Sequence, residues 1–191
     1  MSKAKQIFDY LPGIWHLIRQ TTTPLDHWQN AGAECIKATG IASFTISHED
    51  PNLIIYSESV VIESSNDGNK MSGLEAKQKY KYRFDGNSST LTKYFSDDRK
   101  FYVLDCFSRS ELNNDDCIAA NVSGINQLAA CGEHLCIQDL YVAKYIFKSD
   151  QKFLVKYSIR GPKKCYDILN EYEKCDPNEF SDVKIENEEI S

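Results

Sequence analysis

The sequence predicts an all-β protein, built as an antiparallel up-and-down β-barrel with a short N-terminal helix. From residue 14 onward, apolar and polar side chains alternate with a period of two, which is typical of strands with one buried face. Short segments of turn-forming residues separate these stretches, so consecutive strands are expected to be antiparallel. A closed barrel removes the exposed edges that a flat sheet of this size would leave, and a two-sheet sandwich is the alternative.

The first twelve residues predict the helix. Ile7, Phe8 and Leu11 recur at helical spacing and would form one apolar face. The Pro-Gly pair that follows Leu11 ends the helix, because proline and glycine both disfavour its continuation.

The strands follow one another with few interruptions. The segment KQKYKYRF at 77–84 shows the alternation clearly, because its aromatic side chains share one face and its basic side chains share the other. Breaks rich in Gly, Pro, Asn and Asp separate the strands, since these residues favour turns. Strands are expected at 14–20, 35–47, 53–63, 76–84, 90–95, 100–106, 135–147, 152–160 and 165–173.

Chain length and two irregular segments predict the domain organisation. With 191 residues the chain is long enough for one well-buried domain, expected over 1–175. Residues 107–133 are polar and irregular, with a weakly helical stretch at 125–130, and they predict an insertion or long loop. The acidic segment 176–191 has little to bury and is expected to be a mobile tail.

The overall charge and the N-terminus exclude several classes of protein. A net charge of −6 argues against a general nucleic-acid binder, which usually carries a basic face. The N-terminal segment has charges throughout, so it predicts neither a secretory signal nor a membrane span. The protein is therefore expected to be cytoplasmic or otherwise intracellular.

The cysteines do not predict a metal site. There are seven, none forms a Cys-x-x-Cys pair, and reduced thiols packed as small apolar side chains are the expected state. Cys131, His134 and Cys136 have an unusual spacing for zinc and lack an obvious fourth ligand. The sequence therefore predicts no metal and no cofactor.

The tripeptide Gly13-Ile14-Trp15, where the helix meets the first strand, resembles the Gly-x-Trp signature of lipocalins and their calycin relatives. In that resemblance the indole closes one end of a calycin-like barrel, and a basic residue from a late strand covers it. Arg160 is the residue expected to do so, through a cation–π contact.

A wider set of motifs over residues 11–173, apart from 107–130, resembles the family called domain of unknown function 6314. The resemblance implies a fold and a site but no activity. Where the family pattern has a second His this sequence has Tyr102, and Cys165 replaces an acidic residue. The matching residues are Gly13, Trp15, Arg19, Gly40, Ala42, Phe44, Tyr56, Glu58, Arg99, Phe101, Asp105, His134, Cys136, Asp139, Tyr141, Gly161, Pro162, Lys164 and Tyr166.

Polar residues within the strands predict a candidate site. A carboxylate inside a barrel needs a partner, because burying a lone charge is costly. Asp139 is expected to be buried and hydrogen-bonded to a Tyr or to Arg160, with Lys163 or Lys164 at the cavity entrance. Alternation along one strand places His134 and Asp139 on opposite faces. The candidate ligand-binding residues are Tyr56, Glu58, Arg99, Tyr102, His134, Asp139, Tyr141, Arg160, Lys164 and Tyr166.

The leading functional hypothesis is non-enzymatic binding of a small, partly apolar ligand that carries a polar or anionic group. The same polar residues can instead form networks that fix the register of a solid barrel. In a second hypothesis the protein is a scaffold that binds protein partners through 107–133, with Ile118, Val122, Ile125 and Leu128 exposed or ordered by a partner. A third is a small enzyme using His134 and Asp139 as an acid–base pair. The expected apolar lining consists of the aromatic residues at 44, 56, 80, 82, 84, 141 and 145.

Overall fold

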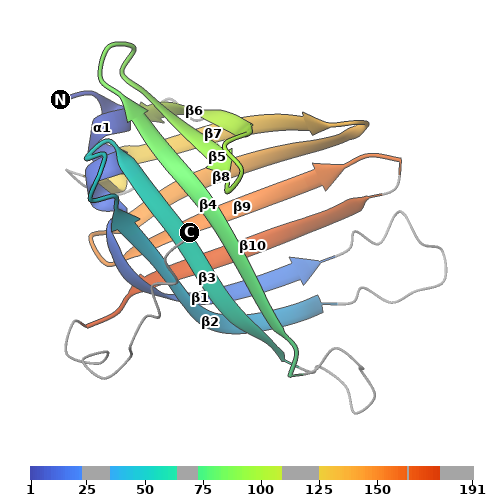
Figure 1. Ribbon diagram of the computed structural model, residues 1–191. Helices are drawn as coiled ribbons and strands as arrows, with labels where there is room; N and C mark the ends of the chain where they lie inside the picture. Colours follow the sequence, from blue (N-terminus) through green and yellow to red (C-terminus); the bar gives the residue numbers. More distant parts are fainter. Residues whose placement is uncertain (23–34, 64–72, 109–124, 163, 177–191) are drawn as a thin grey trace.

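The computed structural model is a closed antiparallel β-barrel with a short helix at one end, which confirms the predicted fold class (Figure 1). It describes residues 1–22, 35–63, 73–108, 125–162 and 164–176. The elements are α1 (Lys3–Tyr10), β1 (Gly13–Thr22), β2 (Cys35–Ile46), β3 (Leu53–Glu63), β4 (Glu75–Asp85), β5 (Thr90–Phe95), β6 (Lys100–Ser108), η3 (Ile125–Gln127), β7 (Leu128–Cys136), β8 (Asp139–Ser149), β9 (Lys152–Arg160) and β10 (Cys165–Lys174).

Each strand pairs with its neighbours in sequence, and the pairing of β1 with β10 closes the barrel. This last ladder runs from Trp15 opposite Lys174 to Thr22 opposite Asp167. Ladder partners share a face of the sheet. The register therefore decides which side chains from distant parts of the sequence meet inside the barrel.

The region predicted as one strand at 135–147 is a hairpin, so that prediction is wrong. β7 and β8 meet at a two-residue turn, Ile137–Gln138, between Cys136 and Asp139. The turn was missed because it contains none of the residues that usually mark one. Part of the predicted 107–133 insertion is consequently strand β7, and the barrel has ten strands.

The hairpin also changes the faces assigned around it. His134 is the ladder partner of Tyr141, and Cys136 is the partner of Asp139, so all four lie on the same face. The prediction that His134 and Asp139 lie on opposite faces is wrong, because the turn resets the alternation between them.

The helix α1 covers one end of the barrel, as Figure 1 shows. Ser2 caps the N-terminus of the helix by accepting a hydrogen bond from the Lys5 backbone. The Ile7 and Phe8 side chains of the helix are buried. Trp15 is fully buried next to the helix and donates from Nε1 to the Leu11 carbonyl at 3.0 Å. The helix and the indole together close this end.

A lysine from the last strand covers Trp15, as the resemblance to calycins implies, but it is Lys174 and not Arg160. The Lys174 Nζ lies 5.3 Å from the Trp15 ring centroid. Gly13 allows this contact, because its φ of +138° suits glycine and a Cβ there would lie 3.1 Å from Lys174 Cε. Arg160 fails to reach the indole because it ends β9 beside the turn to β10, whereas Trp15 pairs with the last residue of β10.

Residues 125–128, which form η3 and the start of β7, bear on the scaffold hypothesis. Leu128 is 4% exposed and belongs to the core, and Ile125 packs against that core. Under the scaffold hypothesis both would be exposed or ordered by a partner, and their packing in the core does not support it. Ile118 and Val122 lie outside the described residues.

Within the described part of the chain, no helix has both the length and the hydrophobicity to cross a bilayer.

The β7–β8 turn generates a prediction about stability. Ile137 has a φ of +59° and is 92% exposed, so a β-branched side chain occupies a strained conformation and buries almost nothing. Replacing Ile137 with Gly should raise the free energy of unfolding by about 1 kcal/mol, measured by urea denaturation. Val103→Gly is the control, since Val103 is an exposed strand residue and its replacement should destabilise the protein. If both variants lose the same free energy of unfolding, the backbone conformation of Ile137 is not strained.

Candidate functional site

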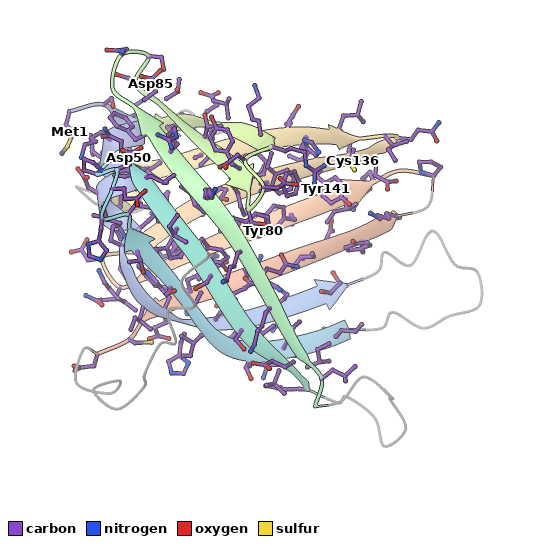
Figure 2. All side chains as sticks on the ribbon, in the orientation of Figure 1. Met1, Asp50, Tyr80, Asp85, Cys136 and Tyr141 are labelled. Atoms are coloured by element: carbon purple, nitrogen blue, oxygen red, sulfur yellow. The ribbon has the colours of Figure 1, made fainter. Side chains whose placement is uncertain are left out.

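A cavity of about 190 Å³ lies inside the barrel and receives side chains from eight of its strands. Figure 2 shows Tyr80 midway along the barrel, with Tyr141 and Cys136 toward the end opposite Met1. The cavity therefore lies between the core beneath the helix and the far end of the barrel. Its lining residues are Arg19, Tyr56, Glu58, Gln78, Tyr80, Lys93, Phe101, Tyr141, Tyr157, Ile159, Tyr166, Ile168, Asn170 and Tyr172.

Lys93 is the most unusual lining residue, because it is a lysine that is only 3% exposed. It lies on β5 in phase with Leu91 and Phe95, so the strand directs it inward. Its Nζ donates to the Tyr157 hydroxyl at 2.9 Å and lies 3.9 Å from the Tyr80 ring centroid. Among the described residues, no carboxylate lies within 4.0 Å of this ammonium. Within the described part of the chain, the charge is thus stabilised by aromatic rings and one hydroxyl and has no counter-ion.

A β-bulge next to Lys93 enlarges the aromatic wall. The register of β5 with β6 changes between Lys93, opposite Tyr102, and Tyr94, opposite Lys100. Phe101 is the extra residue, and both it and Tyr102 are buried although they are consecutive. The two rings contact each other at 4.6 Å between centroids. The bulge thereby places two adjacent aromatic side chains on the inner side.

Four tyrosine hydroxyls form a chain that ends at Lys93. The Tyr82 and Tyr145 oxygens are 3.0 Å apart, those of Tyr145 and Tyr102 are 2.8 Å apart, and those of Tyr102 and Tyr157 are 2.9 Å apart. Burial favours the neutral phenol of Tyr157, but the Lys93 ammonium and the neighbouring tyrosine hydroxyls together outweigh burial and lower the pKa of Tyr157. Tyr157 is therefore a stronger hydrogen-bond donor than an ordinary tyrosine.

A buried ion pair forms a second polar network in the cavity lining. Arg19 Nη2 lies 2.8 Å from Glu58 Oε1 and donates to Oε2 at 2.9 Å, and Arg19 Nε donates to Asn170 Oδ1 at 2.6 Å. Tyr56 donates to Glu58 Oε2 and contacts the Tyr172 hydroxyl at 3.0 Å. Glu58 Oε1 lies close to the charged Arg19 but receives no hydrogen bond of suitable geometry. This buried oxygen can therefore accept a further hydrogen bond.

The pKa values of this network follow from burial and charge. Burial disfavours the charged form of Arg19, but Glu58, Tyr172 and Tyr56 together outweigh this effect and raise the pKa of the guanidinium. Burial, together with the nearby Tyr172 and Glu58, raises the pKa of Tyr56 well above its ordinary value. The Arg19 guanidinium thus stays charged, while Tyr56 and Tyr172 stay neutral.

A third cluster lies near the β9–β10 turn. Lys164 Nζ donates to the Tyr141 hydroxyl at 2.7 Å, which raises the pKa of Lys164, and it lies 3.7 Å from Asp139 Oδ2. Asp139 Oδ1 is buried against Gly161, where a Cβ would lie 2.0 Å from that oxygen. Glycine at 161 therefore lets the carboxylate approach the turn. In the described part of the chain, no group of three or more His, Cys, Asp or Glu is arranged to hold a metal ion.

Several of the residues selected from the sequence meet around the cavity. Tyr56, Glu58, Tyr141 and Tyr166 line it directly. Tyr102 lies behind the wall in the tyrosine chain. The remaining three lie toward the far end: His134 packs 4.9 Å from the Phe101 ring, and Asp139 and Lys164 contact each other.

Three expectations differ from the structure. Arg99 is 75% exposed in its side chain and pairs with Asp97 outside the cavity, because it lies in the turn before β6. Arg160 points away from the cavity and pairs with Asp167 at 2.7 Å, because Ile159 takes the inward position on β9. Asp139 consequently bonds neither Arg160 nor a tyrosine. Lys163 lies outside the described residues.

The list of candidate ligand-binding residues omitted five lining residues that complete the two polar networks, although Arg19 is among the residues that match the family motifs. Their strands contain a signal that identifies them, since each lies in phase with buried side chains of the same strand. On β5, for example, Lys93 shares the phase of two apolar residues, and on β1 the arginine shares the phase of Trp15 and Leu17. The five are Arg19, Lys93, Tyr157, Asn170 and Tyr172.

The aromatic residues expected to line the cavity divide between two regions. Those at 56, 80 and 141 do line it. Those at 44, 82, 84 and 145 are buried in the core instead. Phe44, for example, contacts the rings of Tyr56, Tyr82, Phe153 and Tyr172. Part of the barrel is thus filled by aromatic side chains, and the cavity occupies the rest.

A family model matches residues 11–174, which span all ten strands. The chain belongs to DUF6314, a family of unknown function. The match begins after the residues of α1 and includes the candidate site in full. No curated protein matches this DUF6314 sequence.

Solved structures with a similar fold have very different sequences. The S-type phycobiliprotein lyase CPES from Guillardia theta superposes with a TM-score of 0.58 at 8% identity, over 92% of this chain and 94% of that one. EF1p2_mFAP2b bound to DFHBI gives a TM-score of 0.42 at 10% identity, over 91% of this chain and 100% of that one. The likeness to the lyase supports the fold of this DUF6314 protein.

The Arg19–Glu58 pair generates a prediction about stability. Replacing Arg19 with Met leaves a carboxylate whose side chain is only 2% exposed without its partner, which should lower the free energy of unfolding by about 3 kcal/mol. Replacing both residues with Met should recover most of this loss, because no unpaired charge remains. Urea denaturation at neutral pH measures both effects. A double variant as unstable as Arg19→Met would contradict this account.

Proposed function

We propose that this protein binds a small, partly apolar anion in the barrel cavity without covalent chemistry. The observation that carries the proposal is the buried Lys93 ammonium, which has no carboxylate partner among the described residues. A buried charge is costly unless it is paired. An anionic ligand would supply the missing counter-ion.

The charge balance of the cavity favours a single negative charge on the ligand. Arg19 and Glu58 form an ion pair at 2.8 Å and so neutralise each other. Lys93 is the remaining cation among the lining residues, and the lining tyrosines with resolved shifts other than Tyr157 have raised pKa values and stay neutral. A monoanion therefore matches the lining.

The size and the walls of the cavity favour an aromatic ligand. Cavities of about 150 Å³ in other proteins bind benzene, so about 190 Å³ suits a substituted single ring. Tyr80 and Phe101 stack nearly parallel, with 15° between their planes, and both face the cavity. Flat aromatic walls of this kind suit a planar ring. Small aromatic carboxylates such as benzoate and cinnamate are suitable probes.

The same proposal includes the domain organisation. The strands from β1, which begins at Gly13, to β10, which ends at Lys174, close into one barrel. This closure supports treating residues 1–175 as one binding domain. The scaffold hypothesis loses support because Ile125 and Leu128 are packed against the core. The enzyme hypothesis gains none from the geometry, because His134 contacts aromatic rings whereas Asp139 pairs with Lys164.

A comparison of charged and neutral probes tests the proposal. Isothermal titration should show that benzoate binds at least about tenfold more tightly than benzamide, its neutral isostere, because only benzoate neutralises Lys93. Lys93→Met should abolish this preference. Lys79→Met, which alters an outward lysine on β4, should retain it. Equal affinities for benzoate and benzamide, or no binding of benzoate and cinnamate, would contradict the proposal.

The stability of the Lys93 variant gives an independent check. If Lys93 is kept for ligand binding at a cost in stability, Lys93→Met should raise the free energy of unfolding of the ligand-free protein by about 1 kcal/mol or more. The reason is that methionine fills the aromatic surroundings without a buried charge. Thermal and urea denaturation measure this effect, and a clearly destabilised variant would indicate a structural role for the lysine instead.

A further inference from the structure

The tyrosine chain beside Lys93 contains one proton more than its internal contacts use. The hydroxyls of Tyr82, Tyr145, Tyr102 and Tyr157 make three oxygen–oxygen contacts in a row. Each contact takes one hydroxyl proton, and each hydroxyl supplies one. One of the four protons is therefore left over. On the interior hydroxyls of Tyr145 and Tyr102, which are buried and outside the cavity lining, it would have no acceptor among the described residues, so it points out of an end of the chain.

The two ends of the chain have different surroundings. Tyr82 is 2% exposed, does not line the cavity, and has Tyr145 as its hydrogen-bond partner among the described residues. A proton pointing outward from Tyr82 would be a buried, unsatisfied donor, which costs about 1–3 kcal/mol. Tyr157 lines the cavity, so its proton can reach a ligand. The chain therefore donates from Tyr82 toward Tyr157.

With this direction of donation, the Tyr157 hydroxyl can act toward a ligand as a hydrogen-bond donor but not as an acceptor. Its oxygen has two lone pairs, which accept hydrogen bonds from Tyr102 at 2.9 Å and from Lys93 at 2.9 Å. Both acceptor positions are then filled, and only the hydroxyl proton remains. The Tyr157 side of the cavity can donate but cannot accept.

We infer that Tyr157 and Lys93 form a two-donor site that selects a ligand carboxylate, with the Tyr157 hydroxyl and the Lys93 ammonium each donating to it. This inference rests on the proposed function and specifies its ligand class and its selecting residue. A carboxylate has two oxygens that only accept, so it satisfies both donors together. A group that must itself donate, such as an alcohol or an amine, finds no acceptor on this wall.

The charged surroundings strengthen the Tyr157 donor. Burial raises the pKa of Tyr157, but the Lys93 ammonium and the neighbouring tyrosine hydroxyls together outweigh burial and lower the pKa below its ordinary value of 10.0. The charged and titratable groups that interact electrostatically with this hydroxyl come from β4, β5, β6, β8 and β10, and they are Lys93, Tyr80, Tyr82, Tyr102, Tyr145 and Tyr172. Lys93 is the charged member of this set, and its charge is the largest effect that lowers the pKa of Tyr157.

Affinity measurements on the full chain test the inference, with benzoate as the probe. Tyr157→Phe should weaken benzoate binding about tenfold or more, because a hydrogen bond to a charged group is lost. Tyr10→Phe is the matched control, since its hydroxyl bonds the Ser149 carbonyl near the closed end at 2.8 Å and lies outside the cavity lining. This variant should bind benzoate as the wild type does.

The pH dependence separates ligand donation from a purely structural role. Benzoate is already anionic at neutral pH and should bind the protein with Tyr157 protonated. As pH rises through the pKa of Tyr157, the phenolate repels the carboxylate and neutralises Lys93, so affinity should fall. This fall should begin below the range in which ordinary tyrosines ionise, and Tyr157→Phe should remove it.

The outcomes distinguish this inference from the proposed function. If the wild type prefers benzoate to benzamide but Tyr157→Phe binds benzoate as tightly, the two-donor site is wrong and the proposed function stands. The same holds if the pH profile of Tyr157→Phe matches that of the wild type. If the wild type shows no preference for benzoate, the proposed function itself fails.

Discussion

The pairing of β1 with β10 is the constraint on which the candidate site depends. It joins the ends of the described strand series, and its register places Arg19 directly opposite Asn170. Through that contact the guanidinium is held where it reaches Glu58 on β3. Without closure the strands would form an open sheet, and neither the cavity nor its two polar networks would be enclosed. The ladder that removes the sheet edges therefore also assembles the site.

The barrel interior divides into a filled region and a hollow one according to side-chain type. Near the helix, Trp15, Phe147 and Phe153 pack together and are fully buried. Toward the other end the inward positions carry tyrosines and charged residues, which need polar partners and cannot pack as tightly. The cavity lies where polar requirements replace simple packing. A barrel of this size can hold one small ligand in such a space.

The two buried cations have different relationships to the fold. Arg19 is compensated within the protein by Glu58 and Asn170, so its charge contributes to a complete network. Among the residues that the structure describes, Lys93 contacts a hydroxyl and aromatic rings but no carboxylate. Cation–π contacts stabilise an ammonium, but by much less than full desolvation costs it. This imbalance is typical of a functional site, where a locally unfavourable group is retained for binding.

Much of the fold and part of the site could be predicted from the sequence. Period-two alternation determined most strands and the inward or outward phase within each, because successive side chains of a strand must alternate. Tyr56, Glu58, Tyr141 and Tyr166 were selected on this basis together with the family motifs. The Ile137–Gln138 turn could not be predicted, since nothing in its composition marks it.

Only the tertiary structure decided which inward side chains meet. Lys93 and Tyr157 are 64 positions apart and come into contact through the barrel's curvature and the registers of several ladders. The bulge that turns both Phe101 and Tyr102 inward likewise depends on the pairing of β5 with β6. The sequence by itself determined strands, faces and the chemistry each face carries, because these follow from local alternation. Register, bulges and closure determined the site, because they depend on contacts between strands that local patterning does not encode.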